Sequence, residues 1–404
     1  MDLDLIRQLA VPNDTKIVLV VVDGLGGLPH PDTGRSELEA ANTPQLDRLA
    51  ADSDCGLTVP VAAGVTPGSG PGHLALFGYN PLRYTVGRGV LEALGIDFDL
   101  QPQDVAARGN FCTLDAEGRI SDRRAGRIAT EQTVALCEAL GRIELPGAHL
   151  FVQPVREHRF VLVLRPEGSA NGLSDRLADT DPQREGVAPL EPQALAPEAE
   201  ATAELVRRFV AGSRQVLNGR SPANGLTLRG FASHPRFPSF PETFGLRAAA
   251  IAGYPMYRGL AKLVGMAVLP TGSAFEDELA TVRERWDDFD FFFVHYKAAD
   301  TAGEDGDFER KSAALVAFDK AVPSLRELGA GVLIIAGDHS TPAVLAGHSW
   351  HPVPFLLSSA WTRGDDVDAF NERVCLRGSL GTFPAAEVMS LAMAHAGRLT
   401  KYGA

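Results

Sequence analysis

Acidic and imidazole side chains follow three apolar segments of this chain, at the point where each segment ends. The segments and the residues that follow them are 16–22 (KIVLVVV) with Asp23, 291–294 (FFFV) with His295 and then Asp300, and 331–337 (GVLIIAG) with Asp338 and His339. Buried strands of an α/β protein end at the carboxyl edge of the sheet, where such proteins keep their sites. Asp and His after a strand can also be helix caps or turn residues. Three such positions together favour one convergent site for metal ions.

A serine lies between glycines in the segment 66–73 (TPGSGPGH). Glycines on both sides leave the Ser69 hydroxyl unobstructed and let backbone N–H groups approach an anion. A Gly/Pro/Ser run is also typical of a surface turn. Residues 73–78 (HLALFG), however, read as the start of a helix. A hydroxyl at a helix N-terminus beside metal ions is an activated nucleophile placed to meet phosphate.

The elements that must position these residues alternate between strand and helix in two separate parts of the chain. We expect an α/β core made of residues 1–100 and 245–404, because the metal-type residues fall only in these two parts. Residues 101–244 are predicted to form an inserted α+β domain. Within it, 110–114, 158–164 and 226–231 read as strands, 130–140 and 200–212 as helices, and 182–200 as an irregular connection.

Bulk properties exclude several classes of function. A formal net charge of −13 argues against nucleic acid or an anionic membrane as partner, because binding to either requires a basic face. No run approaches the roughly 20 apolar residues of a membrane span. The four cysteines show no paired metal spacing and are expected to be reduced and structural. We therefore expect a cytoplasmic protein with a small-molecule partner, its oligomeric state being open.

Seven motifs spread along nearly the whole chain resemble those of the archaeal-type cofactor-independent phosphoglycerate mutases, which belong to the alkaline phosphatase superfamily. The motifs are VVDGLGG at 21–27, NTPQLDRLA at 42–50, TPGSGPGHLALFGYNP at 66–81, GRGVLEALG at 87–95, DRRAGR at 122–127, DTDP at 179–182 and GDHSTP at 337–342. The resemblance implies an alkaline-phosphatase-like core sheet with helices on both faces. It also implies interconversion of 3-phosphoglycerate and 2-phosphoglycerate in glycolysis and gluconeogenesis, through a phosphoserine and without bisphosphoglycerate.

The same resemblance implies two divalent metal ions. It assigns Asp300 and His348 to the first site, and to the second site Asp23, Ser69, Asp338 and His339. The family commonly has histidine four residues after the aspartate, in a D-x-x-G-H pattern, but this chain has Glu304 there. A carboxylate ligand would favour Mn²⁺ or Mg²⁺, with Zn²⁺ still possible. His351, three residues after His348, is an alternative ligand, and the two are not exclusive.

Arginines are the expected substrate ligands, because a carboxylate and a phosphate both suit planar, bidentate donors. A run such as Arg123-Arg124-Ala125-Gly126-Arg127 is ordinarily a solvated face, but its match to DRRAGR favours Arg124 and Arg127. Similar candidates beside the predicted strands are His158, Arg159 and Arg229.

Two more residues are assigned roles at the reacting groups. The resemblance places Arg258 near the transferred phosphoryl group. Asp181 could orient the substrate hydroxyl or act as general base, although Asp-Pro is also an ordinary turn element. A metal-dependent phosphatase or another phosphomutase of the superfamily remains the alternative function, since it would use the same nucleophile and metal ions.

Overall fold

The computed structural model describes residues 2–168, 172–365 and 367–403, and the chain divides into two compact units. The core unit consists of Met1–Thr85 and Phe237–Ala404, and the inserted unit of Val86–Arg236. The first boundary falls earlier than residue 100 because helix α5 (Arg88–Gly95) packs against a strand of the inserted unit. At Gly89 a Cβ atom would lie 2.1 Å from the carbonyl oxygen of Ala106, so this close contact requires glycine.

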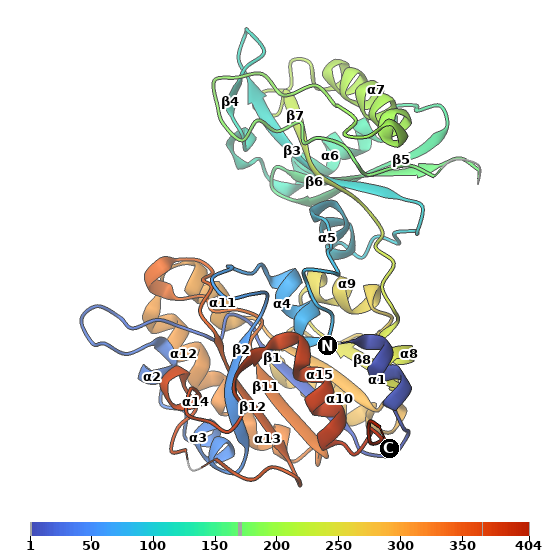
Figure 1. The fold of residues 1–404 in the computed structure, drawn as a ribbon. Coiled ribbons are helices and arrows are strands. Elements are labelled where there is room, and N and C mark those ends of the chain that lie inside the picture. The colour runs from blue at the N-terminus through green and yellow to red at the C-terminus, as the bar shows by residue number, and fades with distance from the viewer. Residues whose placement is uncertain (1, 169–171, 366, 404) are drawn as a thin grey trace. The chain divides into compact units, whose positions relative to one another are not determined.

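An eight-stranded sheet forms the centre of the core unit, in the order β13-β2-β12-β11-β1-β10-β8-β9 (Figure 1). Its strands are β1 Ile17–Val22, β2 Asp54–Val59, β8 Ala248–Ile251, β9 Ala267–Val268, β10 Phe291–Tyr296, β11 Val332–Ala336, β12 Val353–Ser359 and β13 Gly381–Pro384. β1 pairs in parallel with both β10 and β11, and all six of its residues are buried. A continuous apolar run is what a strand covered on both faces requires. The three strands that carry the acidic and imidazole residues are therefore neighbours.

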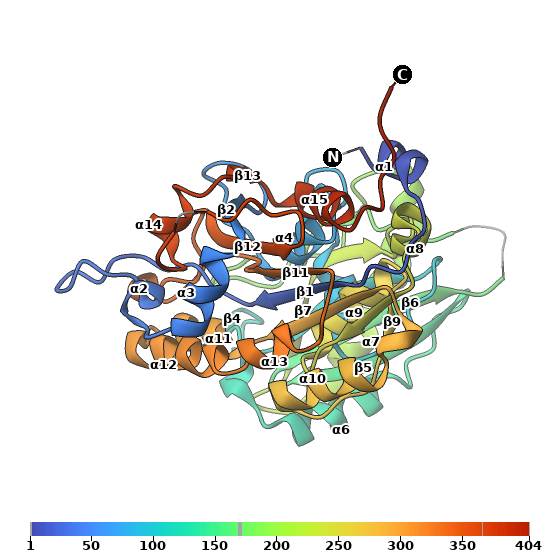
Figure 2. The ribbon, with the colours of Figure 1, turned by 90° about the horizontal axis from the view of Figure 1, so that it is seen from below.

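Helices cover both faces of this sheet. They are α1 Leu3–Leu9, α2 Glu37–Ala40, α3 Pro44–Ala51, α4 Ser69–Leu76, α8 Phe240–Phe244, α9 Pro255–Leu263, α10 Phe275–Glu284, α11 Ala298–Glu304, α12 Phe308–Asp319, α13 Val322–Arg326, α14 Glu372–Cys375 and α15 Val388–His395. Alternate residues of β1 (Val18, Val20 and Val22) share one hydrophobic cluster with α3, α10, α12 and α13. Figure 2 shows α4 and α15 on the opposite side of the sheet from α10, α12 and α13. The predicted α/β core is confirmed.

The inserted unit contains an antiparallel sheet in the order β4-β3-β6-β5, with β7 also pairing with β3. Its elements are β3 Val105–Leu114, β4 Ile120–Asp122, β5 Ala148–Arg156, β6 Arg159–Pro166, β7 Gly225–Ser233, α6 Thr130–Leu140 and α7 Glu200–Leu217. The predicted strands and helices of this part are confirmed, with longer bounds for β3, β7 and α7. One face of the sheet packs with α6 and α7 in a single hydrophobic cluster, and α5 contacts β3, β6 and β7.

Within the residues described, none of the helices is both long enough and apolar enough to cross a membrane. All four cysteines are buried free thiols. Burial raises the pKa of Cys112 and of Cys137 to about 12, so both remain protonated at neutral pH. Neither residue has the thiolate character that reactivity or metal binding would need.

Candidate active site

Ser69 is the first residue of α4, after the N-cap residue Gly68, so the helix begins four residues earlier than expected. Its Oγ lies 3.1 Å from Nε2 of His339. At Gly72 a Cβ atom would lie 2.2 Å from the carbonyl oxygen of Asp338. The glycines around the serine therefore allow α4 to approach the loop after β11, which carries the predicted ligands. His73, one turn further on, lies 2.9 Å from the Ser69 carbonyl oxygen through Nδ1.

One acid–imidazole group forms where β1 and β11 end side by side. We call it group A; it consists of Asp23, Asp338 and His339, all fully buried, with potential ligand atoms within 4.8 Å of one another. Nε2 of His339 is 3.4 Å from Oδ1 of Asp23 and 3.1 Å from Oδ2 of Asp338. Parallel pairing of the two strands brings their carboxyl ends to the same edge of the sheet, which explains the convergence.

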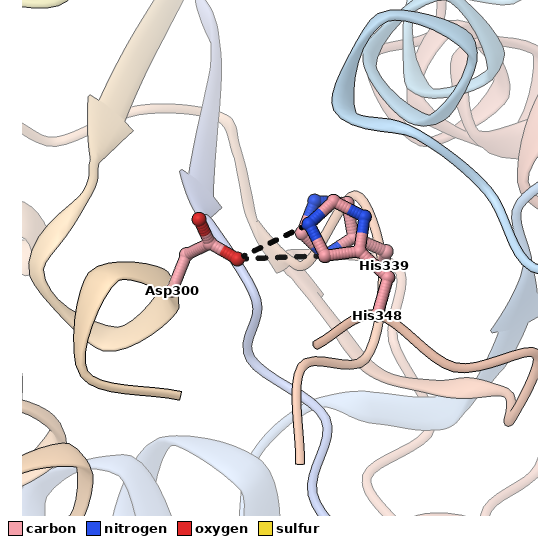
Figure 3. A group of neighbouring side chains, drawn as sticks. All are labelled: Asp300, His339 and His348. Atoms are coloured by element: carbon pink, nitrogen blue, oxygen red, sulfur yellow. Dashed lines mark ion pairs between the residues drawn. The ribbon is translucent and has the colours of Figure 1, made fainter. Parts of the chain in front are cut away.

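A second group, group B, consists of Asp300, His339 and His348, again with potential ligand atoms within 4.8 Å. Figure 3 shows Oδ1 of Asp300 facing both imidazole rings; it lies 3.6 Å from Nε2 of His348 and 3.9 Å from Nδ1 of His339. His339 therefore belongs to both groups, and its Nδ1 also lies 2.9 Å from Oγ1 of Thr341. Oε1 of Glu304, at the end of α11, lies 3.5 Å from Nε2 of His348.

In groups A and B, burial and neighbouring charged groups shift the pKa values of the acidic and imidazole side chains. Burial raises the pKa of Asp338, but the imidazoles of His339 and His73 lower it by more. The pKa of Asp338 therefore lies well below its usual range. Burial lowers the pKa of His348, whereas Glu304, the Pro67 carbonyl and Asp300 raise it, to about 9. Oδ1 of Asp23 and Oδ2 of Asp338 are buried and accept no well-aligned hydrogen bond, although imidazole nitrogens lie 3.1 to 3.4 Å away. Buried anionic oxygens that lack aligned donors and lie beside imidazoles are what a cation site provides.

A separate basic pocket of about 160 Å³ lies on the sheet of the inserted unit. It is lined by Arg108, Asn110, Arg123, Arg124, His158, Arg159 and Arg229. The strand register explains how it forms: Arg108 of β3 faces Arg229 of β7, and Asn110 of β3 faces Arg159 of β6. Residues directly opposite on neighbouring strands share a face of the sheet. Like charges in that position repel one another, so the pocket favours an anion.

Acids partly offset this charge. Glu92 of α5 lies 3.2 Å from Arg108, and Asp181 lies 2.8 Å from Arg123 and 3.5 Å from Arg229. The pocket nevertheless stays basic enough to lower the pKa of His158. Burial and the arginines around it, Arg159 first, lower the pKa of His158 to about 4, so its ring is neutral at neutral pH. Its buried Nδ1 has no hydrogen-bond partner and can bind a ligand oxygen when it carries the proton.

Comparison with known proteins identifies the family. The family model described as 2,3-bisphosphoglycerate-independent phosphoglycerate mutase matches residues 50–224. A probable enzyme of that name from Thermus thermophilus is 50% identical over 412 residues, covering 100% of each chain, and one from Thermotoga neapolitana is 48% identical over 401 residues, covering 99% of this chain and 98% of the relative. The chain belongs to the 2,3-bisphosphoglycerate-independent phosphoglycerate mutase family.

Solved structures agree with membership of the mutase family. The cofactor-independent phosphoglycerate mutase from Thermoplasma acidophilum matches with a TM-score of 0.73 and 30% identity, covering 95% of this chain and 100% of that chain. A protein from Pyrococcus horikoshii matches with a TM-score of 0.82 and 27% identity, covering 97% and 100%. These matches extend over both units, so the inserted unit is part of the shared fold.

Of the metal ligands predicted from the resemblance to the mutase family, all except His351 lie in or beside groups A and B. Groups A and B bring together Asp23, Asp300, Asp338, His339 and His348, with Ser69 and Glu304 in contact with them. His351 bonds Oγ of Ser349 and stacks on Trp350, and neither group contains it.

Most of the predicted substrate ligands of the inserted unit also lie together. Arg124, His158, Arg159 and Arg229 line the basic pocket, whereas Arg127 does not. Asp181 contacts the pocket arginines, as described above. Arg258 lies in α9 of the core unit, directly after Tyr257.

Several residues close to these sites escaped the sequence reasoning. Tyr257 donates a hydrogen bond to Oδ2 of Asp23, and Nζ of Lys297 lies 2.9 Å from the same oxygen and 2.5 Å from Oδ2 of Asp300. Nε2 of His295, which follows one of the apolar segments but was not assigned as a ligand, is 3.2 Å from Oδ2 of Asp23. The position of His295 and Lys297 directly after the apolar part of β10 was the available signal. In the basic pocket, Arg108 and Asn110 were missed, although they are polar residues with a spacing of two inside an apolar strand.

Proposed function

We propose that this chain interconverts 3-phosphoglycerate and 2-phosphoglycerate without bisphosphoglycerate, in glycolysis and gluconeogenesis, through a phosphoserine at Ser69. The observation that carries the proposal is the contact between Oγ of Ser69 and His339, the one imidazole that belongs to both acid–imidazole groups. A hydroxyl so placed at a helix N-terminus is positioned to receive a phosphoryl group. The acidic overall charge and the buried thiols favour a cytoplasmic enzyme that acts on a small molecule and binds neither nucleic acid nor membrane.

Two divalent ions fit the donors of the core unit. We assign Asp300, Glu304 and His348 to one ion, and Asp23, Ser69, Asp338 and His339 to the other. Oδ1 of Asp23 and Oδ2 of Asp338, which accept no well-aligned hydrogen bond, support this assignment. Carboxylates outnumber imidazoles in the combined set, so Mn²⁺ or Mg²⁺ is favoured, with Zn²⁺ possible. When bound, such ions lower the pKa of a coordinated hydroxyl and stabilise negative charge on a phosphoryl group.

The protein residues carry out the transfer in two steps. The oxygen of Ser69 forms a bond to phosphorus as the bond between phosphorus and the glycerate oxygen breaks. Ser69 loses its proton and the departing oxygen gains one, which leaves phosphoserine and free glycerate. The second step is the reverse reaction with the other glycerate hydroxyl. Asp181 serves as base toward that hydroxyl, and Arg258 balances charge on the phosphoryl oxygens.

The inserted unit supplies the substrate-binding part. Its basic pocket holds the glycerate carboxylate through Arg124, Arg159 and Arg229, with His158 as a neutral donor. Arg127 does not line that pocket, and we assign it only a contact with the substrate from beside the pocket. Retention of glycerate between the two steps is what separates a mutase from a phosphatase. A phosphatase is the second candidate, because the core unit alone contains the serine and both acid–imidazole groups.

A coupled assay that follows 2-phosphoglycerate, run beside an assay for inorganic phosphate, separates the two functions. Protein supplied with Mn²⁺ and 3-phosphoglycerate, without bisphosphoglycerate, should form 2-phosphoglycerate much faster than phosphate. Ser69→Ala should abolish this turnover and leave the fold intact, since one hydroxyl contributes little to stability. Ser390→Ala is the matched control: its hydroxyl donates to the Glu387 carbonyl, away from groups A and B, and activity should be unchanged. Turnover in Ser69→Ala would exclude the serine as nucleophile.

A further inference from the structure

Lys311 is a completely buried lysine in α12. Its ammonium donates hydrogen bonds to the carbonyl oxygens of Gly26, at 2.8 Å, and Thr341, at 2.9 Å. Gly26 lies three residues after Asp23, and Thr341 two residues after His339. The lysine therefore binds the backbone of both loops that carry group A, and its hydrogen bonds to them go to main-chain oxygens.

The two loops also meet one another. The backbone N–H of Thr341 donates to the carbonyl of Gly26 at 3.0 Å, so this carbonyl accepts from both Thr341 and Lys311. At Gly26 a Cβ atom would lie 1.9 Å from Oγ of Ser340, so the loops approach as closely as glycine allows. The relative position of Asp23 and His339 thus depends on this junction.

Two acids, the buried Glu37 and the half-buried Glu372, complete the junction. Oε1 of Glu37 lies 4.0 Å from the Lys311 ammonium and accepts the N–H of Ala343 at 2.6 Å. Glu372 accepts the N–H of Gly27 at 2.7 Å. The acids therefore bind the loop N–H groups while the lysine binds the loop carbonyls. Burying such charges costs free energy unless each is paired and hydrogen-bonded, and an apolar residue of similar volume often stabilises as well or better. Stability alone therefore does not account for a buried lysine, rather than an apolar residue, at position 311.

We propose that Lys311 is a positioning residue for the divalent-ion site of group A: its ammonium fixes the loops after β1 and β11 at the separation that lets Asp23, Asp338 and His339 bind one ion. This inference rests on the proposed function for the presence of that ion. Groups that orient metal ligands from behind change metal affinity by about 10- to 100-fold when removed. Lys311→Met, which keeps the length of the side chain, should lower Mn²⁺ affinity by about that factor.

A matched control separates positioning from general stability. Arg398 is also a buried cation, 1% exposed, and its guanidinium donates to the carbonyls of Asn13 and Thr15 at 2.5 and 3.0 Å. Neither carbonyl belongs to a loop that carries a metal ligand of group A or B. Arg398→Met removes the same kind of buried cation–carbonyl contact and should lower the melting temperature while leaving Mn²⁺ affinity unchanged.

The experiment is Mn²⁺ titration by calorimetry on metal-stripped full-length protein, at a temperature where circular dichroism shows each variant folded. The expected result is a loss of affinity of about tenfold or more in Lys311→Met and none in Arg398→Met. Native affinity in Lys311→Met, or an equal loss in both variants, would overturn the proposal.

A second variant covers the case in which Lys311→Met does not fold. Lys311→Gln keeps an N–H donor on a shorter side chain and should bind Mn²⁺ with an affinity between wild type and the loss expected for methionine; native affinity there overturns the proposal equally. Failure of the proposed function looks different, because wild-type protein would then bind no Mn²⁺ or would show no mutase activity.

Discussion

Two histidines, one in each unit, have pKa values shifted in opposite directions. His348 of the core unit titrates at about 9, because Glu304, the Pro67 carbonyl and Asp300 outweigh the effect of burial. His158 of the inserted unit titrates at about 4, because burial and the neighbouring arginines act together. The same side chain thus reports an acidic site that attracts cations and a basic site that attracts anions. A substrate with a carboxylate and a phosphate, handled with divalent ions, needs both.

The two sites are also built differently. Groups A and B form at a point, where loops after neighbouring strands β1, β10 and β11 meet at one sheet edge. The basic pocket forms on a surface, where cross-strand neighbours of an antiparallel sheet share a face. A change at the acidic edge should therefore alter ion binding sharply, whereas the arginines on the sheet share the binding of an anion.

Among the substitutions that separate the acidic site from the basic pocket, those of Glu304 should have the largest effect on metal binding and activity. If its carboxylate is a ligand beside His348, Glu304→Ala should lose one metal equivalent and reduce activity by about 10- to 100-fold or more. Glu304→His should keep activity and shift the preference from Mn²⁺ or Mg²⁺ toward Zn²⁺, because nitrogen replaces oxygen. Glu309→Ala, an exposed acid in the next helix, is the control. Calorimetric titration with each metal decides the matter. Two native-affinity ions in Glu304→Ala would exclude this ligand and make His351 the next residue to test.

Arg124 tests the anion side with a smaller expected effect. Arg124→Ala should raise the ratio of phosphate release to isomerisation, because glycerate escapes before the second transfer. The loss of one charge-assisted hydrogen bond should weaken the binding of glycerate by about 1.5–3 kcal/mol. The affinity for metal ions should not change. Arg119→Ala, an exposed arginine of the same unit, should leave the ratio as in wild type. If Arg124→Ala also leaves it unchanged, Arg124 does not hold the substrate.

The pH dependence of His158 is the smallest expected effect. Its folded pKa is depressed from 6.5 to about 4, so the unfolded chain binds more protons between these values. Its contribution to stability is present above pH 6.5 and is lost as the pH falls toward 4. Addition of 3-phosphoglycerate should raise this pKa, because the ligand's negative charge offsets the arginines. NMR titration of the imidazole resonances, with His158→Gln for assignment, measures both values; an unshifted pKa with ligand present would place the anion elsewhere.

Much of the core could be predicted from the sequence because its signal is local. The apolar runs before Asp23, Asp300 and Asp338 are long enough to identify buried strands. Asp23 and Asp338 follow their runs directly, whereas Asp300 follows in the next helix. The sharing of His339 between two groups could not be predicted, since it depends on which strands are neighbours. Lys297 was missed for the same reason: its ammonium bridges Asp23, which follows β1, and Asp300 in α11.

The inserted unit was less predictable because its site depends on register. The facing of Arg108 and Arg229, more than a hundred residues apart, is fixed only when β3 and β7 pair. Arg124 and Arg127 could not be separated from the motif alone. The chain has positive φ angles at Ala125, Gly126 and Arg127, so helical spacing does not apply there, and only Arg124 lines the pocket. The boundary at Val86 was displaced because α5 continues the alternation of the core while packing on β3.

Identification of the residue that carries phosphate during turnover is the decisive experiment for the proposed phosphoserine. Protein with Mn²⁺ and 3-phosphoglycerate, without bisphosphoglycerate, is quenched in acid after milliseconds and digested, and the peptides are analysed by mass spectrometry. We expect one phosphorylated peptide, with phosphate on Ser69, that is absent from Ser69→Ala and disappears when the substrate is consumed. Phosphate on another residue, or isomerisation that proceeds only after bisphosphoglycerate is added, would contradict this expectation.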